Sequence, residues 1–476
     1  MTATGRQPIE PTVKALRVVQ WWDTLPRKTR IVTVVLPTVL SLLIALAWGW
    51  AIGQHHYQFD LRLYYDAVNW WMSGNDLFSY SQPDPVNIEL GFTYPPLSAV
   101  VMAPMGILPY PVVLAVSLAA IVVCAAIFVF LVLRERLALP RTLLLAATGV
   151  GTGFAFLLEP FRQTFSFGQI NVYLALLVAV DLLVLGRRGS RWTGVGIGLA
   201  TAIKLTPGIF IVYLLLTRRW RAAGTAAAAA VAATLFGAVF APSETWRYFT
   251  SIIFDTSRVG FIDSTMNQSV NGLLARLSDP LPPSGLAWLA LGGAIAAVGL
   301  WRARRAALAG DELAGMTLAG LAGVLISPVS WVHHIIWLFP AMLLVSLRLA
   351  GAIRSLLHDS QPGSGRTERA LTARIVEVVV CSLLITVGLV VWCLPANNIL
   401  GTYTPDFAGG GPLLAVAASL QLLWLVVAVF ALPVREPVPT GPGPVTGTTP
   451  GVVDDARRQA RPGTSPAVSE RRPLGT

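Results

Sequence analysis

The chain has 476 residues, of which 54% are hydrophobic and only 12% are charged, and its mean hydropathy is +0.65. Soluble domains carry about 25% charged residues, so this composition excludes an ordinary soluble enzyme. The net charge of +11 comes from basic residues scattered in short clusters between apolar spans, which indicates membrane orientation and not a nucleic-acid-binding domain.

The chain begins with a polar, basic segment, residues 1–30, followed by an apolar run at 31–52. This run is too long for a cleaved signal peptide, whose apolar core spans about 7–15 residues, so it predicts a first transmembrane helix. Further runs predict an all-α polytopic membrane protein with about ten full crossings in a domain spanning residues 31–432. These runs are 111–133, 141–158, 169–185, 222–241, 286–301, 313–327, 332–349, 375–394 and 412–432.

The basic residues predict the orientation of these helices. With a cytoplasmic N-terminus, 29 of the 35 basic residues fall in inner segments, five in outer loops and Lys204 within the membrane, and both termini are cytoplasmic. Two remaining apolar stretches must then be re-entrant. Residues 95–109 dip in from outside, and residues 193–217 enter from inside and return after a break at Lys204–Pro207–Gly208. A helix of about 12 residues rises ~18 Å, which places Lys204 in the outer half of the hydrocarbon core.

The long connections lie on the outer side in this topology, near residues 53–94, 242–285 and 395–411. Functional residues concentrate on such loops. Residues 433–476 are rich in Pro, Gly, Thr and Arg and lack apolar periodicity, which predicts a disordered cytoplasmic tail. We expect no second folded domain.

The segment after the first helix has apolar residues at helical spacing, among them Leu61, Tyr64, Val68 and Met72. This pattern predicts an amphipathic helix on the outer membrane surface that begins at Asp60. Asp60 is either an N-cap, which accepts hydrogen bonds from the first turn, or a carboxylate that takes a proton from a hydroxyl group. The spacing leaves both interpretations open.

Lys204 is a strong signal because an ammonium group in an apolar segment must snorkel, pair or line a polar cavity. The glycines of 194–198 just before it predict close helix packing, since no strand precedes them as in a nucleotide-binding motif. The adjacent His333 and His334 face different directions on a helix, so this pair alone does not predict a metal site. Glu159, Arg162, Gln169 and Asn171 lie at the outer ends of two helices, where polar side chains near lipid are costly unless they face a cavity or bond to one another. Further polar residues cluster in the outer loop 242–285, namely Arg258, Asn267, Gln268 and Asn271.

Together these residues resemble glycosyltransferase family 87, the multi-spanning GT-C-type enzymes of actinobacterial envelopes that use polyprenol-phosphate sugars. Within it, the chain is similar to α-1,2-mannosyltransferases that extend phosphatidylinositol mannosides or branch lipomannan. The resemblance runs from about residue 60 to about residue 340. It rests on Asp60-Leu61 with Tyr64, Phe92-Thr93-Tyr94-Pro95-Pro96, Phe167-Gly168-Gln169-Ile170-Asn171, Lys204-Leu205-Thr206-Pro207, Asn267-Gln268, and Ser327-Pro328-Val329-Ser330-Trp331 with His333-His334.

The resemblance implies a GT-C-type fold in the plasma membrane with an active site facing outside. It also implies a polyprenyl-phospho-mannose donor, a mannosylated lipid or lipoglycan acceptor, and an aspartate in the first outer loop as the base, which matches Asp60. An inverting transfer then needs one base and no covalent enzyme intermediate. The candidates for the donor phosphate are Lys204, Arg258, His333 and His334. The candidates for substrate binding are Tyr64, Tyr94, Arg162, Gln169, Asn171, Asn267 and Gln268.

No acidic pair suited to Mg²⁺ is evident, so we expect a reaction without metal or other cofactor. Two alternatives stay open. One is transfer of a pentose such as arabinofuranose from polyprenyl phosphate. The other is a transporter or flippase of lipid-linked sugars, because broken helices and an intramembrane lysine also mark substrate pathways. Transporters commonly have two repeated halves, and the absence of such a repeat in the sequence favours outward-facing catalysis.

Overall fold

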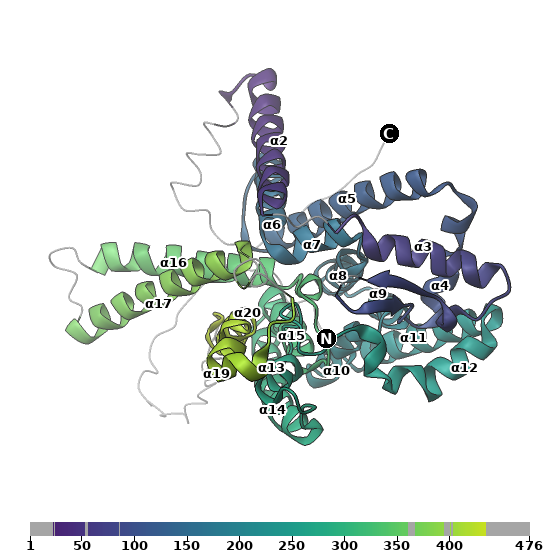
Figure 1. Cartoon of the computed structure of the whole chain (residues 1–476). Coiled ribbons are helices and arrows are strands. Elements are labelled where there is room, and N and C mark those ends of the chain that lie inside the picture. Colours follow the sequence, from purple (N-terminus) through teal and green to yellow (C-terminus); the bar gives the residue numbers. More distant parts are fainter. Residues whose placement is uncertain are drawn as a thin grey trace, which may run out of the picture. The chain divides into compact units, whose positions relative to one another are not determined.

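The computed structural model describes residues 24–52, 56–84, 86–359, 367–394 and 403–434, together with Trp22 and Leu400. These ranges are mostly helical, and their strands form one short hairpin (Figure 1). The predictions for residues 1–21 and for the tail beyond residue 434 lie outside the described residues, as does part of the predicted outer loop 395–411.

Seven helices of the described ranges are long and apolar enough to cross a membrane, or eight spans exist if the bent pair α6 and α7 counts as one. This result confirms a multi-pass helical membrane protein, but it does not confirm ten full crossings. The runs predicted at 169–185 and 313–327 form helices of only 10 to 17 residues. The long elements are α2 (Arg27–Ala51), α5 (Tyr110–Arg136), α11 (Trp220–Phe240), α14 (Gly285–Leu308), α16 (Leu338–Asp359), α17 (Glu368–Cys393), and α19 (Phe407–Ala417) continued by α20 (Leu420–Ala431).

Shorter elements connect the long helices. The predicted amphipathic helix is α3 (Phe59–Met72), and the hairpin that follows it pairs β1 (Ser81–Asp84) antiparallel with β2 (Ile88–Gly91). The stretch predicted to dip in from outside forms α4 (Pro96–Met102) and η2 (Ala103–Ile107). The remaining short helices are η1 (Leu77–Ser79), α6 (Arg141–Leu157), α7 (Glu159–Phe167), α8 (Asn171–Val180), η3 (Asp181–Leu185), α9 (Val195–Ile203), η4 (Thr206–Gly208), α10 (Ile209–Leu216), α12 (Pro242–Thr250), η5 (Ile252–Phe254), η6 (Thr256–Val259), α13 (Val270–Ser278), α15 (Glu312–Ile326) and η7 (Val332–His334).

The predicted break at Lys204 is confirmed. Helix α9 ends at Ile203, and α10 begins at Ile209 after the single turn η4. The start of this segment lies at the beginning of α11, because the Arg221 guanidinium donates a hydrogen bond to the Ser190 carbonyl at 2.9 Å. Since α10 leads into the same end of α11, the segment returns to the side from which it came, and Lys204 lies at its far end.

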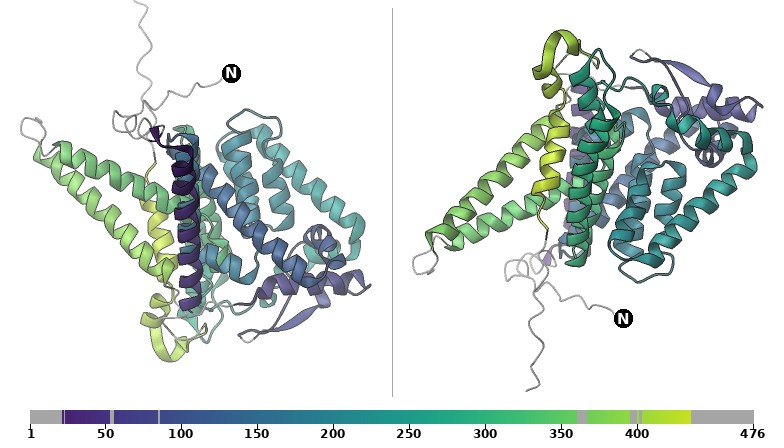
Figure 2. Two further views of the ribbon diagram at one scale, coloured as in Figure 1. Left: turned by 90° about the horizontal axis from the view of Figure 1, so that it is seen from above. Right: turned by 90° about the horizontal axis from the view of Figure 1, so that it is seen from below.

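Small residues allow the helices to pack closely. A Cβ atom at Gly194 or Gly198 of the α9 segment would collide with the backbone of α11, so the packing predicted for these glycines is confirmed. Gly149 and Gly153 of α6 likewise allow close packing against α2, because a Cβ atom at these positions would collide with Thr38 and Ser41. Helices α2 and α6 lie side by side, and Figure 2 shows α2, the dark purple helix near the N-terminus, against the helical bundle.

Ion pairs join the helix ends that carry the basic clusters. Arg136 at the end of α5 pairs with Asp311 just before α15 at 2.5 Å. The next residue, Glu312, accepts a hydrogen bond from Arg219 just before α11 at 2.9 Å. These three helix ends therefore lie together, as expected for connections that the basic residues assign to one side. That this side is cytoplasmic stays a prediction.

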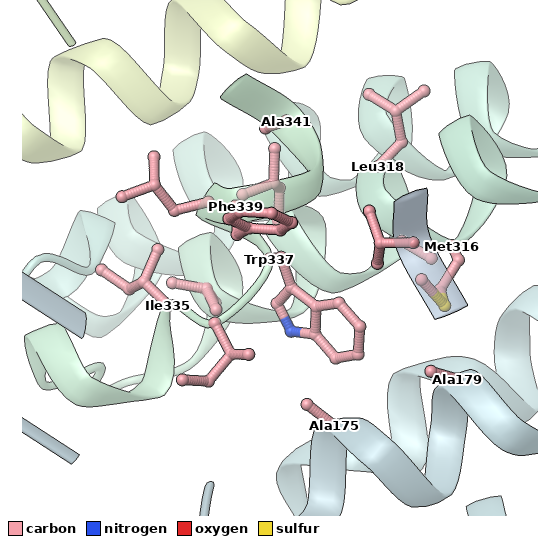
Figure 3. Packing of buried hydrophobic residues seen from close by; sticks show 14 of the residues in the cluster. Ala175, Ala179, Met316, Leu318, Ile335, Trp337, Phe339 and Ala341 are labelled. Atoms are coloured by element: carbon pink, nitrogen blue, oxygen red, sulfur yellow. The ribbon is translucent and has the colours of Figure 1, made fainter. Parts of the chain in front are cut away.

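The core fixes the chain that follows the two histidines. Trp337 and Phe339 lie in the core with Ala175 of α8 and Met316 of α15 (Figure 3). Gly320 of α15 leaves room for the Trp337 indole, because a Cβ atom there would collide with it. The aromatic anchors therefore hold η7 against the bundle.

Candidate active site

A cavity of about 920 Å³ lies where the predicted outer loops converge. It is lined by the start of α3, the β hairpin, the chain before α4, the α7–α8 connection, the break between α9 and α10, the chain around η5 and η6, and residues 327–334. Tyr403 adds a contribution from the third loop. Eight predicted site residues line it: Asp60, Tyr64, Tyr94, Gln169, Lys204, Arg258, His333 and His334.

Asp60 does not cap its helix. Helix α3 begins at Phe59 after Gln58, and no side chain of the described residues caps it, so the N-cap interpretation of Asp60 is wrong. The Asp60 carboxylate accepts a hydrogen bond from Gln169 Nε2 at 2.6 Å instead. Burial raises the pKa of Asp60 to about 7, although the hydrogen bond from Gln169 and the charge of Lys204 act to lower it. The carboxylate is therefore suited to exchange a proton near neutral pH.

A chain of hydrogen bonds orients Gln169. Its Oε1 atom accepts from the Tyr94 hydroxyl at 3.1 Å and from Asn171 Nδ2 at 3.3 Å. The Tyr94 and Tyr64 hydroxyl oxygens are 3.0 Å apart. Burial raises the pKa of both tyrosines, so their phenols stay neutral and hold the Gln169 amide with its N–H toward Asp60.

Lys204 is buried and pairs with polar side chains, so it does not snorkel to the surface. Its Nζ atom donates to Asn171 Oδ1 at 2.9 Å and to the Tyr94 hydroxyl at 3.2 Å, and it lies 2.9 Å from His334 Nε2. An ammonium group has three N–H donors, and these three contacts use all of them. The lysine thus joins the turn between α9 and α10 to the Gln169 network and to η7.

The surroundings of the two histidines favour the neutral form of each ring. Burial, followed by the nearby charge of Lys204, lowers the pKa of His333 and His334 well below the usual value. When Lys204 is charged, its ammonium group donates to His334 Nε2, and the proton of His334 then lies on Nδ1. In the described part of the chain, His334 Nδ1 and both ring nitrogens of His333 have no hydrogen-bond partner. Buried ring nitrogens that lack partners and lie in a cavity wall are suited to a ligand.

Arg258 and an aromatic wall complete the cavity. The Arg258 guanidinium donates to the Phe78 carbonyl at 2.7 Å, which fixes it beside the hairpin. The rings of His56 and Phe167 are stacked with centroids 3.8 Å apart, and the His333 ring lies 5.6 Å from Phe167. Among the described residues, no group of three or more His, Cys, Asp and Glu side chains is placed to hold a metal ion.

Arg162 lies outside the cavity lining, although it was predicted to bind substrate. It is 5% exposed and donates to the carbonyls of Leu157 and Cys393, so it connects α7 with the end of α17. Carbonyls at helix ends lack intrahelical partners, and a guanidinium group satisfies them well. Asn171 also lies outside this lining, but it contacts Lys204 directly.

Asn267 and Gln268 are likewise buried away from the cavity and hold backbone together. Asn267 Oδ1 accepts from the backbone N–H of Ser330 at 3.0 Å. Gln268 Nε2 donates to the Ala418 carbonyl at 2.9 Å, and its Oε1 accepts from the backbone N–H of Leu422 at 2.8 Å. Irregular backbone in an apolar bundle needs such partners, so these amides fix the segments behind the cavity wall.

Sequence reasoning did not select His56, Phe167 or Asp84, which also line the cavity. Asp84 Oδ1 accepts from the backbone N–H of Val86 at 2.9 Å and closes the turn of the hairpin, and its charge raises the pKa of Asp60. Their place in the sequence could have indicated them, because all three residues lie in or beside the segments that carry Asp60 and Gln169.

Comparison with known proteins gives consistent matches. The sequence model of glycosyltransferase family 87 matches residues 92–328. The chain is 34% identical over 333 residues to the polyprenol-phosphate-mannose-dependent alpha-(1-2)-phosphatidylinositol mannoside mannosyltransferase of Mycobacterium tuberculosis, covering 66% of this chain and 77% of that protein. It is 33% identical over 317 residues to the corresponding pentamannoside mannosyltransferase of Mycolicibacterium smegmatis, covering 64% and 73%.

A shorter match relates the chain to a protein with another sugar in its name. It is 31% identical over 174 residues to the alpha-(1->3)-arabinofuranosyltransferase of Mycobacterium tuberculosis, covering 34% of this chain and 37% of that protein. No solved structure gives a significant match.

Proposed function

This chain belongs to glycosyltransferase family 87, and from that premise we propose that it transfers mannose from polyprenyl-phospho-mannose to a hydroxyl group of a mannosylated glycolipid or lipoglycan. The names of the similar mannosyltransferases support this donor and a phosphatidylinositol mannoside acceptor. The proposed product linkage is α-1,2, as in those names.

The observation that carries the proposal is the position of Asp60. Its carboxylate lies in a large cavity, keeps a pKa near 7 and is oriented by Gln169. In the proposed step, the oxygen of the acceptor hydroxyl attacks the anomeric carbon of mannose while the bond from that carbon to the phosphate oxygen breaks. The hydroxyl proton passes to Asp60, and the polyprenyl phosphate leaves with the bonding electron pair.

We propose that this step inverts the anomeric centre. An acceptor oxygen that attacks from the face opposite the phosphate converts a β-linked mannosyl phosphate into an α-glycoside. One base beside the acceptor hydroxyl is sufficient for this reaction, which agrees with a single carboxylate, Asp60, at the end of the Gln169 network.

Lys204, His334 and Arg258 are the proposed partners of the donor phosphate. Negative charge develops on the phosphate as the sugar leaves, and fixed donors in an enclosed cavity stabilise such charge strongly. His334 Nδ1 has no hydrogen-bond partner among the described residues, whereas Lys204 must exchange one of its present contacts for a phosphate oxygen. The Lys204 charge acts on the phosphate in either arrangement.

We further propose a GT-C-type arrangement in the plasma membrane, with cytoplasmic termini and the cavity on the outer side. This proposal is supported by the ion-paired, arginine-rich helix ends, which lie together. Lys204 lies at the opposite end of the α9–α10 segment. Positively charged connections remain on the cytoplasmic side.

The test is transfer by the purified full chain in lipid vesicles. Radiolabelled polyprenyl-phospho-mannose is supplied with a phosphatidylinositol mannoside, and the products are extracted and digested with an α-1,2-specific mannosidase. We expect a product one mannose longer whose label the mannosidase releases. Movement of labelled donor between leaflets without a longer product would contradict the proposal and favour a flippase.

The match to an arabinofuranosyltransferase supports one second candidate, transfer of a pentose from polyprenyl phosphate. The same assay separates the two functions when both donors are supplied at equal concentration. A product that carries pentose and no mannose would select the second candidate.

A further inference from the structure

A second cavity, of about 670 Å³, lies between α14, α16, α17 and the end of α20. It is far from the catalytic cavity. Trp288 of α14 donates to the Ile326 carbonyl next to Ser327, which lines the catalytic cavity, whereas Arg302 of α14 lines the second one. The helical rise of about 1.5 Å per residue places Arg302 ~21 Å beyond Trp288 along the axis.

Four arginines, Arg302, Arg305, Arg348 and Arg374, line this second cavity, which we call the arginine cavity. Glu377 is the one acidic residue of its described lining, and it pairs with both Arg348 and Arg374. Because one carboxylate faces four guanidinium groups, the arginine cavity carries excess positive charge. A ligand that neutralises it must be an anion.

Two of the arginines are placed by contacts that leave their charge unneutralised. The guanidinium of Arg302 donates to the carbonyls of Val429 and Leu432 at the end of α20. Arg305 lies over the Trp301 ring, 5.1 Å from its centroid, and makes no ion pair with any described residue. Planar guanidinium groups held in this way bind phosphate oxygens in pairs.

The apolar part of the wall points to a lipid. Val376 and Val380 of α17 line the arginine cavity, are 55% and 44% exposed, and lie on one face of the helix with Leu383, which is 58% exposed. This apolar face leads away from the arginines along α17, and Figure 1 shows α17 beside α16. Basic cavities between transmembrane helices bind anionic lipid headgroups.

We propose that the arginine cavity binds the phosphate of an anionic phospholipid, whose acyl chains lie along α17. The chain's own C-terminal segment is a poor occupant, since residues 435–476 contain six arginines and four acidic residues and thus also carry a positive charge. The proposal does not depend on the sugar that the catalytic cavity transfers.

The test measures lipid binding by the purified full chain in a neutral detergent. Thermal unfolding is followed during titration with phosphatidylglycerol, with phosphatidylcholine and with inorganic phosphate, because a ligand of the folded state raises the unfolding temperature. The variant is Arg305→Gln combined with Arg348→Gln. Both side chains are exposed, so the variant is expected to fold. The control is Arg354→Gln, an exposed arginine of α16 outside the arginine cavity.

We expect phosphatidylglycerol to stabilise the wild type and the control equally. The double variant should bind this lipid at least about tenfold more weakly, because it loses charged hydrogen bonds to the phosphate. Equal binding by the double variant and the wild type would overturn the site. Equal weakening by Arg354→Gln would reduce the effect to general surface charge and overturn it too. Stabilisation by inorganic phosphate at the same concentrations would assign the site to a soluble phosphate and refute the lipid.

Discussion

The substitution Asp60→Asn separates catalysis from structure. Asn Oδ1 can keep the hydrogen bond from Gln169 Nε2, and no helix cap is lost because α3 is not capped by Asp60. The amide cannot take a proton. General-base assistance contributes roughly 10²–10⁴-fold, so we expect the transfer rate to fall by at least ~10²-fold in a protein that inserts normally.

The raised pKa of Asp60 gives this prediction its pH dependence. The base must be ionised, and its pKa of about 7 means that the wild-type rate should rise tenfold per pH unit well below pH 7 and level off above it. The variant should lose this limb. The folded-state pKa of Asp60 lies above its ordinary value of 3.8, so the unfolded chain loses this proton first as the pH rises from about 4 to about 7, which disfavours the folded state. Asp60→Asn should therefore be at least as stable as the wild type at pH 8.

The assay is mannosyl transfer from polyprenyl-phospho-mannose, normalised to inserted protein, between pH 5.5 and 8.5. Asp66→Asn is the matched control, because Asp66 lies on the same helix, pairs with Arg62 at 2.6 Å and does not line the cavity. Near-normal turnover by Asp60→Asn would refute the base assignment. The search would then move to other ionisable side chains of the cavity lining, such as Asp84, since Glu159 is buried against Gln163 outside the cavity.

Three further predictions concern the same network and the topology. Lys204→Met should insert normally and raise the KM for the donor by ~10-fold or more through loss of a charged contact to phosphate, whereas unchanged donor kinetics would make Lys204 structural. Gln169→Ala removes a hydrogen bond that lowers the pKa of Asp60, so the acid limb of the pH–rate profile should move to higher pH, and an unmoved limb would contradict this role. In intact cells, a membrane-impermeant thiol reagent should label Glu89→Cys and not Arg188→Cys, and the reverse pattern would overturn the topology.

The crossing segments illustrate how much of the fold follows from composition. Long apolar runs predict α5, α11 and α17 because the bilayer selects for length and hydropathy, which are local properties. The same reasoning overcounts full crossings, since residues 169–185 and 313–327 are apolar but form short helices. These short helices are buried against other helices. A hydropathy average over neighbouring positions in the sequence does not detect such packing.

Individual polar residues show how far the sequence alone predicts the active site. Lys204 is recognisable from sequence because an ammonium group in an apolar segment needs a partner, yet nothing in the sequence says that the partner is Tyr94, Asn171 or His334. Asn267 and Gln268 belong to equally suggestive motifs, but their amides are used by backbone groups behind the wall. Residue type alone does not distinguish a ligand contact from a structural one.

The helical, membrane-spanning class, the break at Lys204 and the importance of the first outer loop can be predicted from the amino-acid order, because hydropathy, charge and helix-breaking residues act over a few neighbouring positions. The packing of the folded chain brings Asp60 to Gln169 across 109 positions, and Lys204 to His334 across 130. Those contacts depend on how the short helices pack against α11 and α15. The pKa of Asp60 follows from the same packing, since burial is a property of the assembled bundle and not of the segment that carries the carboxylate.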